Sequence, residues 1–500
     1  MNRPLICMTL AGKTLEEDYA LVKKYENQID LVELRVDFLN EDEQLYVKRF
    51  PALIYHPCIL TIRRKIDGGL FNGGEFSRTN LFGRALAFAN PNKSKNFAYV
   101  DFEEDFQIPS IQDIAMAFGV RIIRSFHNMN ENVINIKEKC DSMRKTGYEI
   151  PKIDFFPNNL SDVAAIFAEC KSLPKYNHIV TALGVQGLPS RILAELTGSY
   201  LTYISPEETL KQTKDLGYID PKAMIDLYNF KNISGKTKLF GLAEWSGQNE
   251  YAIQILNREF QNQNIDAVLI PLRSPLISDC LYFAEQLNFS GLIICEPFLE
   301  TTSYYLSEQS SELAQIGSCN TVLRKNNKWQ GINTLAQGFK TALEEFLNGT
   351  RIWHRKIAVI GAGGLARTVA YILHQKGAKV CIFNRTIERA QIIAEKYGFF
   401  YSTLEPSSAE LLDEFSGLII QTTSIGSDLQ DSTKKMTDPI PFYKFRGDEM
   451  LMDLIYSPEM TPLRRRASQA GCKTTNGKAM FEYSTKQQIK LFMEKFETLR

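Results

Sequence analysis

The stretch Tyr148-Glu149-Ile150-Pro151-Lys152-Ile153-Asp154-Phe155-Phe156-Pro157 places one lysine inside a short apolar segment with β character. Such a segment, bounded by prolines, predicts a buried strand. Because an ammonium group is costly to bury, Lys152 is expected to have either a depressed pKa or a special partner. A lysine in that setting can attack a carbonyl carbon and form an imine. The alternative is a lysine at a strand end that simply reaches solvent.

Length and charge narrow the classes of function. The chain has 500 residues, enough for about three domains. Lysine plus arginine and aspartate plus glutamate are balanced at 58 each, so the net charge gives no reason to expect binding to nucleic acid or to an anionic membrane surface. Small-molecule chemistry is therefore favoured.

The cysteines and the apolar segments point to the compartment. Nine cysteines, an odd number without a Cys-x-x-Cys pair, argue against a disulfide framework and against a structural zinc site. They indicate a reducing compartment, which we take to be the cytoplasm, and we expect no metal. No stretch of about 18 apolar residues predicts a membrane span. Residues 5–11 are too few for a signal peptide and are predicted to form the first strand.

Short apolar segments recur through the first 230 residues, separated by longer amphipathic or polar stretches. There are eight, at residues 4–9, 30–36, 58–62, 97–102, 120–126, 150–156, 178–183 and 200–204. Strands that alternate with helices predict a parallel sheet, and eight such units suit a closed (β/α)₈ barrel. The predicted fold class is α/β, beginning with a TIM barrel.

Charged side chains gather where these predicted strands end, which is where barrels of this kind carry their chemistry. Glu33 and Arg35 are two residues apart and therefore share one face of a strand. The fourth predicted strand ends in Asp101-Phe102-Glu103, and the residues assigned to the candidate site are Glu33, Arg35, Arg63, His127, Lys152 and Arg191. Any single member could instead be a solvated loop residue, but the set together predicts an active site in the mouth of the barrel.

Several motifs of this region resemble the type I 3-dehydroquinate dehydratases in order and spacing, over about residues 4–225. They are Glu33-Leu34-Arg35-Val36-Asp37, Thr61-Ile62-Arg63, Ser125-Phe126-His127-Asn128, Pro151-Lys152-Ile153, Gly184-Val185-Gln186-Gly187-Leu188-Pro189-Ser190-Arg191 and Gly198-Ser199.

The resemblance implies a Schiff-base mechanism that needs no cofactor. Lys152 would form an imine with the ring ketone of 3-dehydroquinate, and His127 would move the protons that lead to 3-dehydroshikimate. It also implies that Arg191 holds the substrate carboxylate, and that Glu33, Arg35 and Arg63 hold hydroxyl groups and orient the histidine.

Two positions depart from that family. A glutamate usually follows the arginine of the third strand and lies near the histidine, and here the matching residue is Asp67. The last barrel loop usually offers a serine and a glutamine to the substrate. In the segment Lys211-Gln212-Thr213-Lys214-Asp215-Leu216-Gly217-Tyr218, Tyr218 stands where the glutamine would be.

Polar stretches divide the chain into predicted domains. Residues 229–238 turn polar, and Leu347-Asn348-Gly349-Thr350 marks a second boundary. We expect a barrel at residues 1–228, a substrate domain at 236–347 and a Rossmann domain at 350–475. A C-terminal helix at 476–500 is expected to pack back on the substrate domain.

The segment Lys356-Ile357-Ala358-Val359-Ile360-Gly361-Ala362-Gly363-Gly364-Leu365-Ala366-Arg367 has the pattern of a strand, a Gly-x-Gly-x-x-Ala turn and a helix start. That context predicts a dinucleotide site with the pyrophosphate at the helix N-terminus. The next predicted strand ends in Asn384-Arg385-Thr386 rather than in an acid, which favours NADP over NAD, and Arg389 can share the charge of the 2′-phosphate. A Rossmann-like fold without a cofactor is the alternative.

This half resembles the shikimate dehydrogenases over about residues 238–500. The matching motifs are Gly317-Ser318-Cys319-Asn320-Thr321, Gly331-Ile332-Asn333-Thr334, the glycine turn, Asn384-Arg385-Thr386, Thr422-Thr423-Ser424-Ile425-Gly426, Asp453-Leu454-Ile455-Tyr456-Ser457-Pro458 and Thr461-Pro462-Leu463. The resemblance implies substrate contacts from Asn320 and Tyr456. The predicted cofactor-binding residues are Gly361, Ala362, Gly363, Gly364, Ala366, Asn384, Arg385, Thr386, Arg389, Thr422, Ser424 and Gly477.

The match fails at the catalytic positions of that second family. Leu299 stands where the family has a lysine, Leu335 where it has an aspartate, and Ser484 where it has a glutamine. Two hypotheses follow. Either the chain is bifunctional, with a dehydrogenase half that acts weakly or on a more apolar substrate and uses a residue such as Glu300, or only the dehydratase is an enzyme and the second half is an NADP-binding or scaffolding module.

Overall fold

The structure is a computed structural model that describes residues 3–87, 90–130, 135–210, 214–245, 247, 250–427 and 437–497. It divides into two compact units. One comprises Met1–Gly241 with Ile253–Phe289, and the other Leu242–Ala252 with Ser290–Arg500. Each unit has its own parallel sheet.

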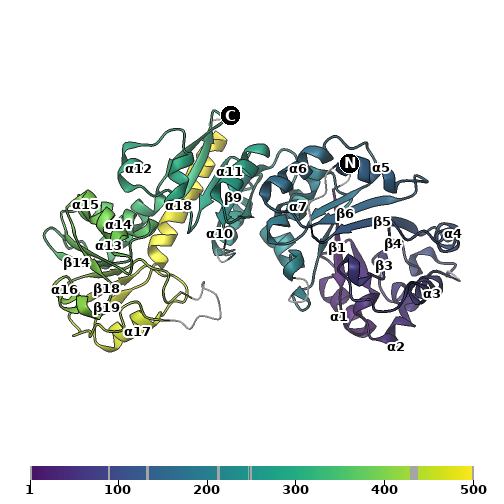
Figure 1. Cartoon of the computed structure of the whole chain (residues 1–500), viewed down its shortest axis with the longest axis horizontal. Coiled ribbons are helices and arrows are strands. Elements are labelled where there is room, and N and C mark those ends of the chain that lie inside the picture. The colour runs from purple at the N-terminus through teal and green to yellow at the C-terminus, as the bar shows by residue number, and fades with distance from the viewer. Residues whose placement is uncertain are drawn as a thin grey trace. The chain divides into compact units, whose positions relative to one another are not determined.

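The first unit is built around an eight-stranded parallel sheet in the part of the chain that the structure describes, with the strand order β7-β6-β5-β4-β3-β2-β1-β8. Figure 1 shows these strands, coloured purple to blue, with helices around them. The strands are β1 Leu5–Leu10, β2 Leu31–Arg35, β3 Cys58–Thr61, β4 Tyr99–Glu103, β5 Arg121–Asn128, β6 Ile150–Phe155, β7 Ile179–Ala182 and β8 Leu201–Ile204. The predicted barrel is confirmed, although the hydrogen-bonded ladder stays open between β7 and β8.

Helices follow the barrel strands and cover their outer face. They are α1 Leu15–Tyr25, α2 Glu41–Gln44, α3 Glu75–Leu86, α4 Pro109–Ala117, α5 Ile136–Met143, α6 Leu160–Cys170, α7 Leu188–Ile192 and α8 Ala194–Thr197. Local sequence starts several of them. Thr14 accepts a hydrogen bond from the Glu17 amide and the Glu17 side chain bonds back, which forms a capping box at the start of α1.

Alternation along the strands fills the barrel interior in layers. The innermost apolar layer consists of Cys7, Leu31, Ile59, Tyr99, Ile123, Ile150, Ile179 and Leu201. Because side chains of a strand alternate between its two faces, the residues two positions further along also point inward. In β6 that next inward residue is Lys152, so the apolar layer forms a floor beneath the predicted site.

A five-stranded sheet has the order β10-β9-β11-β12-β13, with strands β9 Lys238–Glu244, β10 Ala267–Arg273, β11 Gly291–Ile294, β12 Thr321–Lys325 and β13 Lys328–Ile332. Helices α10 Glu250–Asn262 and α11 Ile277–Gln286 accompany it. Within the first unit, α11 packs on α6, where the rings of Phe283 and Phe167 lie 5.9 Å apart. The unit division therefore groups residues 253–289 with the barrel, and the four domain ranges expected from the sequence stay a prediction.

The second unit contains a six-stranded parallel sheet with the order β16-β15-β14-β17-β18-β19. Its strands are β14 Lys356–Ile360, β15 Lys379–Asn384, β16 Phe400–Thr403, β17 Ile419–Gln421, β18 Met450–Asp453 and β19 Lys473–Thr475. The helices are α12 Ser311–Ile316, α13 Thr334–Phe346, α14 Gly364–Gln375, α15 Ile387–Tyr397, α16 Ala409–Glu414, α17 Pro462–Gln469 and α18 Lys478–Glu497.

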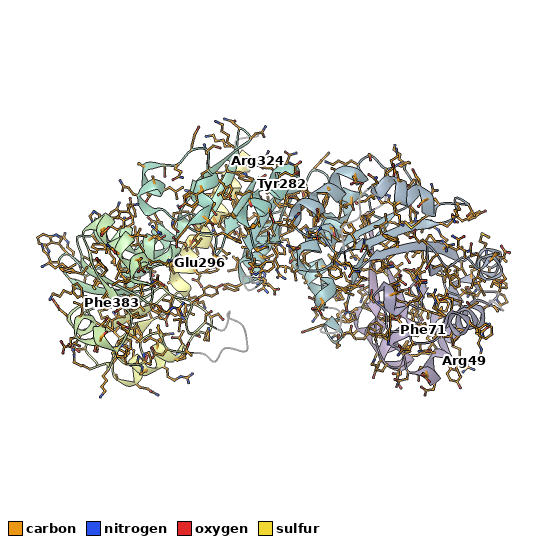
Figure 2. All side chains as sticks on the ribbon, viewed as in Figure 1. Arg49, Phe71, Tyr282, Glu296, Arg324 and Phe383 are labelled. Carbon is orange, nitrogen blue, oxygen red and sulfur yellow. The ribbon has the colours of Figure 1, made fainter. Side chains whose placement is uncertain are left out.

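Both faces of this sheet are buried, as expected for parallel strands between helices. Ile357 and Val359 face α13, α14 and α15, whereas Ala358 and Ile360 face α16 and α17. Phe383 on β15 is completely buried and is labelled in Figure 2. The continuous apolar segments of the sequence therefore reflect burial on two sides, and the predicted Rossmann-like fold is confirmed.

In the residues that the structure describes, no helix has both the length and the apolar character that crossing a membrane requires.

Arg78 on α3 is fully buried and ties the helix to the barrel. Its guanidinium donates to Glu103 Oε2 at 2.6 Å and to the Ile62 carbonyl at 3.0 Å. Arg78→Ala leaves the buried Glu103 carboxylate without this partner, so we expect the opening free energy of β3 and β4 to fall by about 3–5 kcal/mol. Native-state hydrogen exchange of peptides from those strands measures this free energy. Tryptophan fluorescence would not report on it, because all three tryptophans lie outside the barrel. Arg84→Ala, at an exposed position of the same helix, is the matched control, and equal effects of the two changes would contradict the expectation.

Candidate active site

Two polar layers lie above the apolar floor of the barrel. The lower layer contains Thr9, Glu33, Thr61, Asp101, Ser125, Lys152, Thr181 and Tyr203, all buried. The upper layer, two residues further along the strands, includes Arg35, Arg63, Glu103, His127 and Asp154. The predicted residues Glu33, Arg35, Arg63, His127 and Lys152 line a single pocket, together with Asp67, Gly68, Met129, Asp154, Leu183, Leu216 and Tyr218.

Lys152 is enclosed by carboxylates. Its Nζ lies 3.2 Å from Asp101 Oδ2, 3.5 Å from Asp154 Oδ2 and 3.9 Å from Glu33 Oε1, and 4.2 Å from the centre of the Tyr203 ring. Burial alone would lower the pKa of Lys152, but these carboxylates outweigh it and raise the pKa above its ordinary value. Of the two expectations for a buried lysine, the partner is therefore correct and the depressed pKa is wrong.

His127 has a polar partner at each ring nitrogen. Its Nδ1 lies 2.9 Å from Arg63 Nη1, and its Nε2 lies 3.2 Å from Asp154 Oδ2. Burial, followed by the charge of Arg63, lowers the pKa of His127, although Asp154 opposes this shift. The imidazole is therefore neutral at neutral pH, which is the form that can accept a proton.

Arg63 connects three strands of the barrel. Besides His127, it donates to Ser125 Oγ at 3.0 Å and to Asp101 Oδ2 at 2.9 Å. Burial opposes ionisation of Asp101, but Arg63 and Lys152 outweigh it and hold the pKa of Asp101 well below its usual range. Asp101 is thus a permanent anion shared by the arginine and the lysine.

Glu33 and Arg35 project from β2 into the pocket with fixed orientations. Glu33 accepts hydrogen bonds from the hydroxyl groups of Thr9 at 3.0 Å and Thr61 at 2.9 Å. Arg35 forms a two-pronged pair with Asp37, at 2.9 and 2.8 Å. Both side chains are preorganised by neighbours from the barrel itself, which limits their freedom to move away from a ligand.

Arg191, which was expected in the mouth of the barrel, does not line the pocket. It is buried on α7, donates to the Leu216 and Tyr203 carbonyls at 2.9 and 3.3 Å, and stacks on the Tyr218 ring at 4.4 Å. Tyr218 lines the pocket whereas Arg191 does not. Burial lowers the pKa of Arg191, because its guanidinium is poorly solvated. An anion beside Arg191 would therefore stabilise its positive charge. Of the loop segment that contains Tyr218, residues 211–213 lie outside the described residues.

In the second unit, the predicted glycine turn joins β14 to α14. Gly361 has φ of +110°, and a Cβ there would lie 2.5 Å from Thr422 Oγ1, so only glycine fits this turn. The residues predicted to bind the cofactor lie mostly beyond the carboxyl ends of the neighbouring strands β14, β15 and β17. Gly477 lies before α18, where a Cβ would be 2.1 Å from the Leu454 carbonyl oxygen, so it serves close packing.

A carboxylate of the chain itself occupies the start of α14. Glu296, labelled in Figure 2, lies close to the first turn of the helix: its Oε1 would be 3.3 Å from a Cβ at Gly364 and 3.7 Å from one at Gly363. The residue as a whole is exposed, but its carboxylate lies against the helix, and desolvation there together with the charge of Glu300 raises its pKa. The N-terminus predicted to receive a pyrophosphate therefore already faces an anion.

The neighbouring arginines are also paired internally. Glu300 lies 3.1 Å from Arg367 Nη2 and 2.7 Å from Arg389 Nη2. Arg389, predicted to share the charge of a 2′-phosphate, thus contacts Glu300, whereas Arg385 is exposed beyond the end of β15. The sequence suggested Glu300 as a substitute catalytic residue. In the structure its carboxylate is paired with Arg367 and Arg389.

Asn320, predicted to contact a substrate, is buried in an internal network. Its Oδ1 accepts from the Thr334 amide at 2.8 Å and its Nδ2 donates to Thr334 Oγ1 at 2.8 Å. The hydroxyl groups of Thr334 and Ser484 lie 2.7 Å apart, which links α13 to α18. Both polar atoms of the Asn320 side chain therefore form hydrogen bonds within the protein.

Tyr456 lies in an aromatic pocket. Its ring stacks on that of Phe481 with centroids 4.7 Å apart, and Tyr251 lies 6.3 Å away. Ser457, Glu459, Asn476 and Lys478 complete the lining. This pocket offers flat apolar surfaces with a few polar groups at its edge.

Comparisons with known proteins find relatives of both parts of the chain. A family model described as type I 3-dehydroquinase matches residues 6–234, and one described as shikimate / quinate 5-dehydrogenase matches residues 343–441. The bifunctional 3-dehydroquinate dehydratase/shikimate dehydrogenase of Arabidopsis thaliana is 28% identical over 517 residues, covering 98% of this chain and 82% of that protein. The shikimate biosynthesis protein AroDE of Chlamydia pneumoniae is 24% identical, covering 99% of this chain and 96% of its own.

A shikimate dehydrogenase (NADP(+)) of Alkaliphilus oremlandii is 32% identical over 260 residues, which cover 50% of this chain and 88% of that protein. The chain belongs to the type I 3-dehydroquinase and shikimate dehydrogenase families. Both resemblances expected from its motifs are confirmed, and the order of the two domains matches that of the bifunctional relatives.

In the shikimate dehydrogenase domain, the two leucines at the expected catalytic positions are packing residues. Leu299 is buried, and its Cβ would lie 2.6 Å from a Cβ at Gly364. Leu335 is partly buried against the apolar cluster of α13 and α14. Neither side chain can donate a proton or hold a hydroxyl group.

In the 3-dehydroquinase domain, sequence reasoning placed Asp101 at the end of a strand in the mouth of the barrel without giving it a role, and it missed Asp154. Asp154 was visible two residues after Lys152, and alternation alone places both on one strand face. Asp67, expected beside the histidine, instead accepts from Arg64 Nε at 2.6 Å. The carboxylate at the histidine is therefore Asp154.

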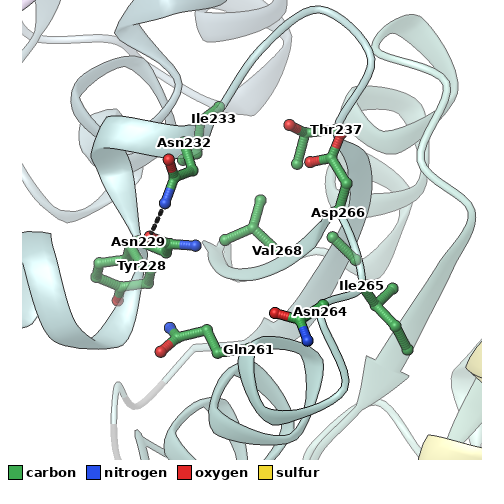
Figure 3. Close-up of a pocket in the computed structure, with 11 residues that line it drawn as sticks. Tyr228, Asn229, Asn232, Ile233, Thr237, Gln261, Asn264, Ile265, Asp266 and Val268 are labelled. Atoms are coloured by element: carbon green, nitrogen blue, oxygen red, sulfur yellow. Dashed lines mark hydrogen bonds between the residues drawn. The ribbon is translucent and has the colours of Figure 1, made fainter.

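A further pocket lies at residues 228–237 and 261–268 of the first unit, where Asn232 donates to Asn229 at 2.6 Å (Figure 3). Its described lining includes the carboxylate of Asp266 but no lysine, arginine or histidine. It lacks the acid and base pairs of the barrel site, which therefore remains the catalytic candidate.

Proposed function

We propose that the barrel catalyses the dehydration of 3-dehydroquinate to 3-dehydroshikimate. The observation that carries this proposal is the placement of Lys152 and His127 on the same carboxylate oxygen of Asp154, inside a pocket lined by Glu33, Arg35 and Arg63. A nucleophilic amine and a neutral imidazole side by side are what an imine-based elimination requires.

The chemistry would proceed in balanced steps. The Lys152 ammonium first loses a proton, and its amine attacks the ring carbonyl carbon, so that the carbonyl oxygen leaves as water and an imine remains. His127 takes a proton from the carbon next to the imine carbon and returns one to the departing hydroxyl group, which leaves as a second water. Hydrolysis of the imine consumes one water and releases the product and the amine.

The surrounding charges would serve binding and proton transfer. Because its pKa is raised, Lys152 has to be deprotonated within the site, and Asp101 and Asp154 are the carboxylates nearest to its Nζ. Arg35, Arg63 and Glu33 would hold the substrate hydroxyl groups. Arg191 would attract the substrate carboxylate from behind Tyr218.

Borohydride reduction in the presence of 3-dehydroquinate should trap a covalent adduct on Lys152, because borohydride reduces an imine to a stable secondary amine. Mass spectrometry of the peptide that contains Lys152 measures the mass increase. Lys152→Gln should abolish both the adduct and the turnover. An unmodified Lys152 in protein that is turning over substrate would count decisively against the mechanism.

For the second domain, we propose NADP as the cofactor. The glycine-only turn at Gly361, the start of α14 and the exposed Arg385 support a dinucleotide with a 2′-phosphate. Bound NADPH would supply a hydride. Glu296 lies where the pyrophosphate would meet the helix, so its carboxylate would have to move aside or become protonated for the cofactor to bind.

A second candidate function for this domain is cofactor binding without reduction of 3-dehydroshikimate, and Leu299 and Leu335 favour it. Assays of NADPH oxidation with 3-dehydroshikimate should show no turnover above background, because neither leucine can donate a proton. The double variant Leu299→Lys with Leu335→Asp should gain measurable oxidation. Turnover by the unaltered protein would instead establish a working bifunctional enzyme or a substitute proton donor.

Glu296→Gln should tighten NADP⁺ binding by about fivefold, the equivalent of about 1 kcal/mol, because it removes an anion from the helix N-terminus. The affinity of the unaltered protein should rise as the pH falls, since protonation neutralises Glu296, whereas that of the variant should depend less on pH. Isothermal titration calorimetry measures both. The exposed Glu410, on α16 of the same unit, provides the control Glu410→Gln, and equal effects of the two changes would exclude competition by Glu296.

A further inference from the structure

Asp154 holds a central place in the barrel site that the two family resemblances do not assign. Its side chain is buried at the end of β6, two residues beyond Lys152 and on the same strand face. A single oxygen, Oδ2, lies 3.2 Å from His127 Nε2 and 3.5 Å from Lys152 Nζ. Asp154 thus connects the expected nucleophile and the expected base directly.

The two neighbours of the imidazole define where its proton lies. The guanidinium of Arg63 can only donate, so His127 Nδ1, 2.9 Å from Arg63 Nη1, has to be the acceptor. The proton of the neutral ring is then on Nε2, where the Asp154 carboxylate, which only accepts, receives it. The lone pair that can take a substrate proton is therefore on Nδ1, available once a substrate hydroxyl group takes over the hydrogen bond from Arg63.

Asp67 does not fill this role in the structure. It corresponds to the acidic residue expected near the histidine, yet its hydrogen-bonded partner is Arg64 Nε, at 2.6 Å. Arg64 also holds Asp105 with both nitrogens of its fork, at 3.0 and 2.9 Å. Asp67 thus belongs to an arginine pair at the rim of the pocket.

We propose that Asp154 is the positioning residue of the dehydration site, which orients His127 through Nε2 and balances the charge of Lys152. The proposal rests on the function proposed for the barrel. Asp154 acts through its two neighbours and takes over from the residue aligned with Asp67.

Several other charged or titratable groups face this pair from the elements packed around it, so the effect of Asp154 has to be separated from theirs. They are Cys7 on β1, Glu33 and Arg35 on β2, Arg63 after β3, Asp101 and Glu103 on β4, Arg191 on α7, Tyr203 on β8 and Tyr218. All of them remain in a variant of Asp154 alone.

Removal of the Asp154 charge should shift the pKa values of His127 and Lys152 in a known direction. Asp154 raises the pKa of both His127 and Lys152, so an amide in its place lowers both values. The imidazole would then stay neutral, and the amine would become free, at lower pH than in the unaltered protein. Because both groups act in their neutral forms, both changes should move the acid limb of the pH profile toward lower pH.

The test is Asp154→Asn in the full chain, with the dehydration followed as a function of pH. We expect kcat to fall by about 10- to 100-fold with little change in KM, because an uncharged amide no longer stabilises the imidazolium that forms when His127 takes the substrate proton. The pH profile of kcat/KM should move down by about one pH unit. Borohydride should still trap the adduct on Lys152, which separates failure of this proposal from failure of the imine mechanism.

Asp67→Asn is the matched comparison, since it makes the same chemical change in the same pocket. It should leave the pH profile in place. Nitrogen-15 NMR of the histidine-labelled chain, which has five histidines, should show a lower pKa of His127 in Asp154→Asn than in the unaltered protein and in Asp67→Asn, while Arg63 keeps the Nε2–H form in all three. An unshifted profile in Asp154→Asn, or the shift in Asp67→Asn instead, would overturn the proposal.

Discussion

The ammonium group of Lys152 is the constraint on which the barrel site depends. It lies in the interior of the protein, where an isolated charge is unstable, and Asp101, Asp154 and Glu33 compensate it from three different strands. Those carboxylates in turn are compensated by Arg63. The result is a charge network in which each member is held by neighbours, so the geometry of the lysine and the imidazole is set before a substrate arrives.

The same rule of charge compensation shapes the second unit with a different outcome. The start of α14 and the arginines beside it attract anions, and in the structure Glu296 and Glu300 occupy them. The barrel directs its charges into a pocket, whereas the Rossmann-like domain neutralises its own. Leu299 and Leu335 lie in the same domain as packing residues.

Much of the fold could be predicted from the sequence, because the period of apolar residues is a local property. The barrel strands lie within one or two residues of the predicted segments, and the glycine turn lies between β14 and α14 as expected. The gap between β7 and β8 could not be predicted, since closure of a barrel depends on strand tilt and register summed over all strands. The grouping of residues 253–289 with the barrel depends on contacts between helices distant in sequence, such as that of Phe167 with Phe283.

The sequence by itself predicted that Lys152 and His127 share one site, because both lie toward the ends of neighbouring parallel strands, and in the structure both line one pocket. It also identified Glu33, Arg35 and Arg63, which line the same pocket. Only the tertiary structure decided which carboxylate meets the histidine, that Asp67 pairs with Arg64, and that Arg191 lies behind Tyr218. The physical reason is that spacing along a strand defines the face of a side chain, whereas its partner depends on rotamers and on the tilt of other strands.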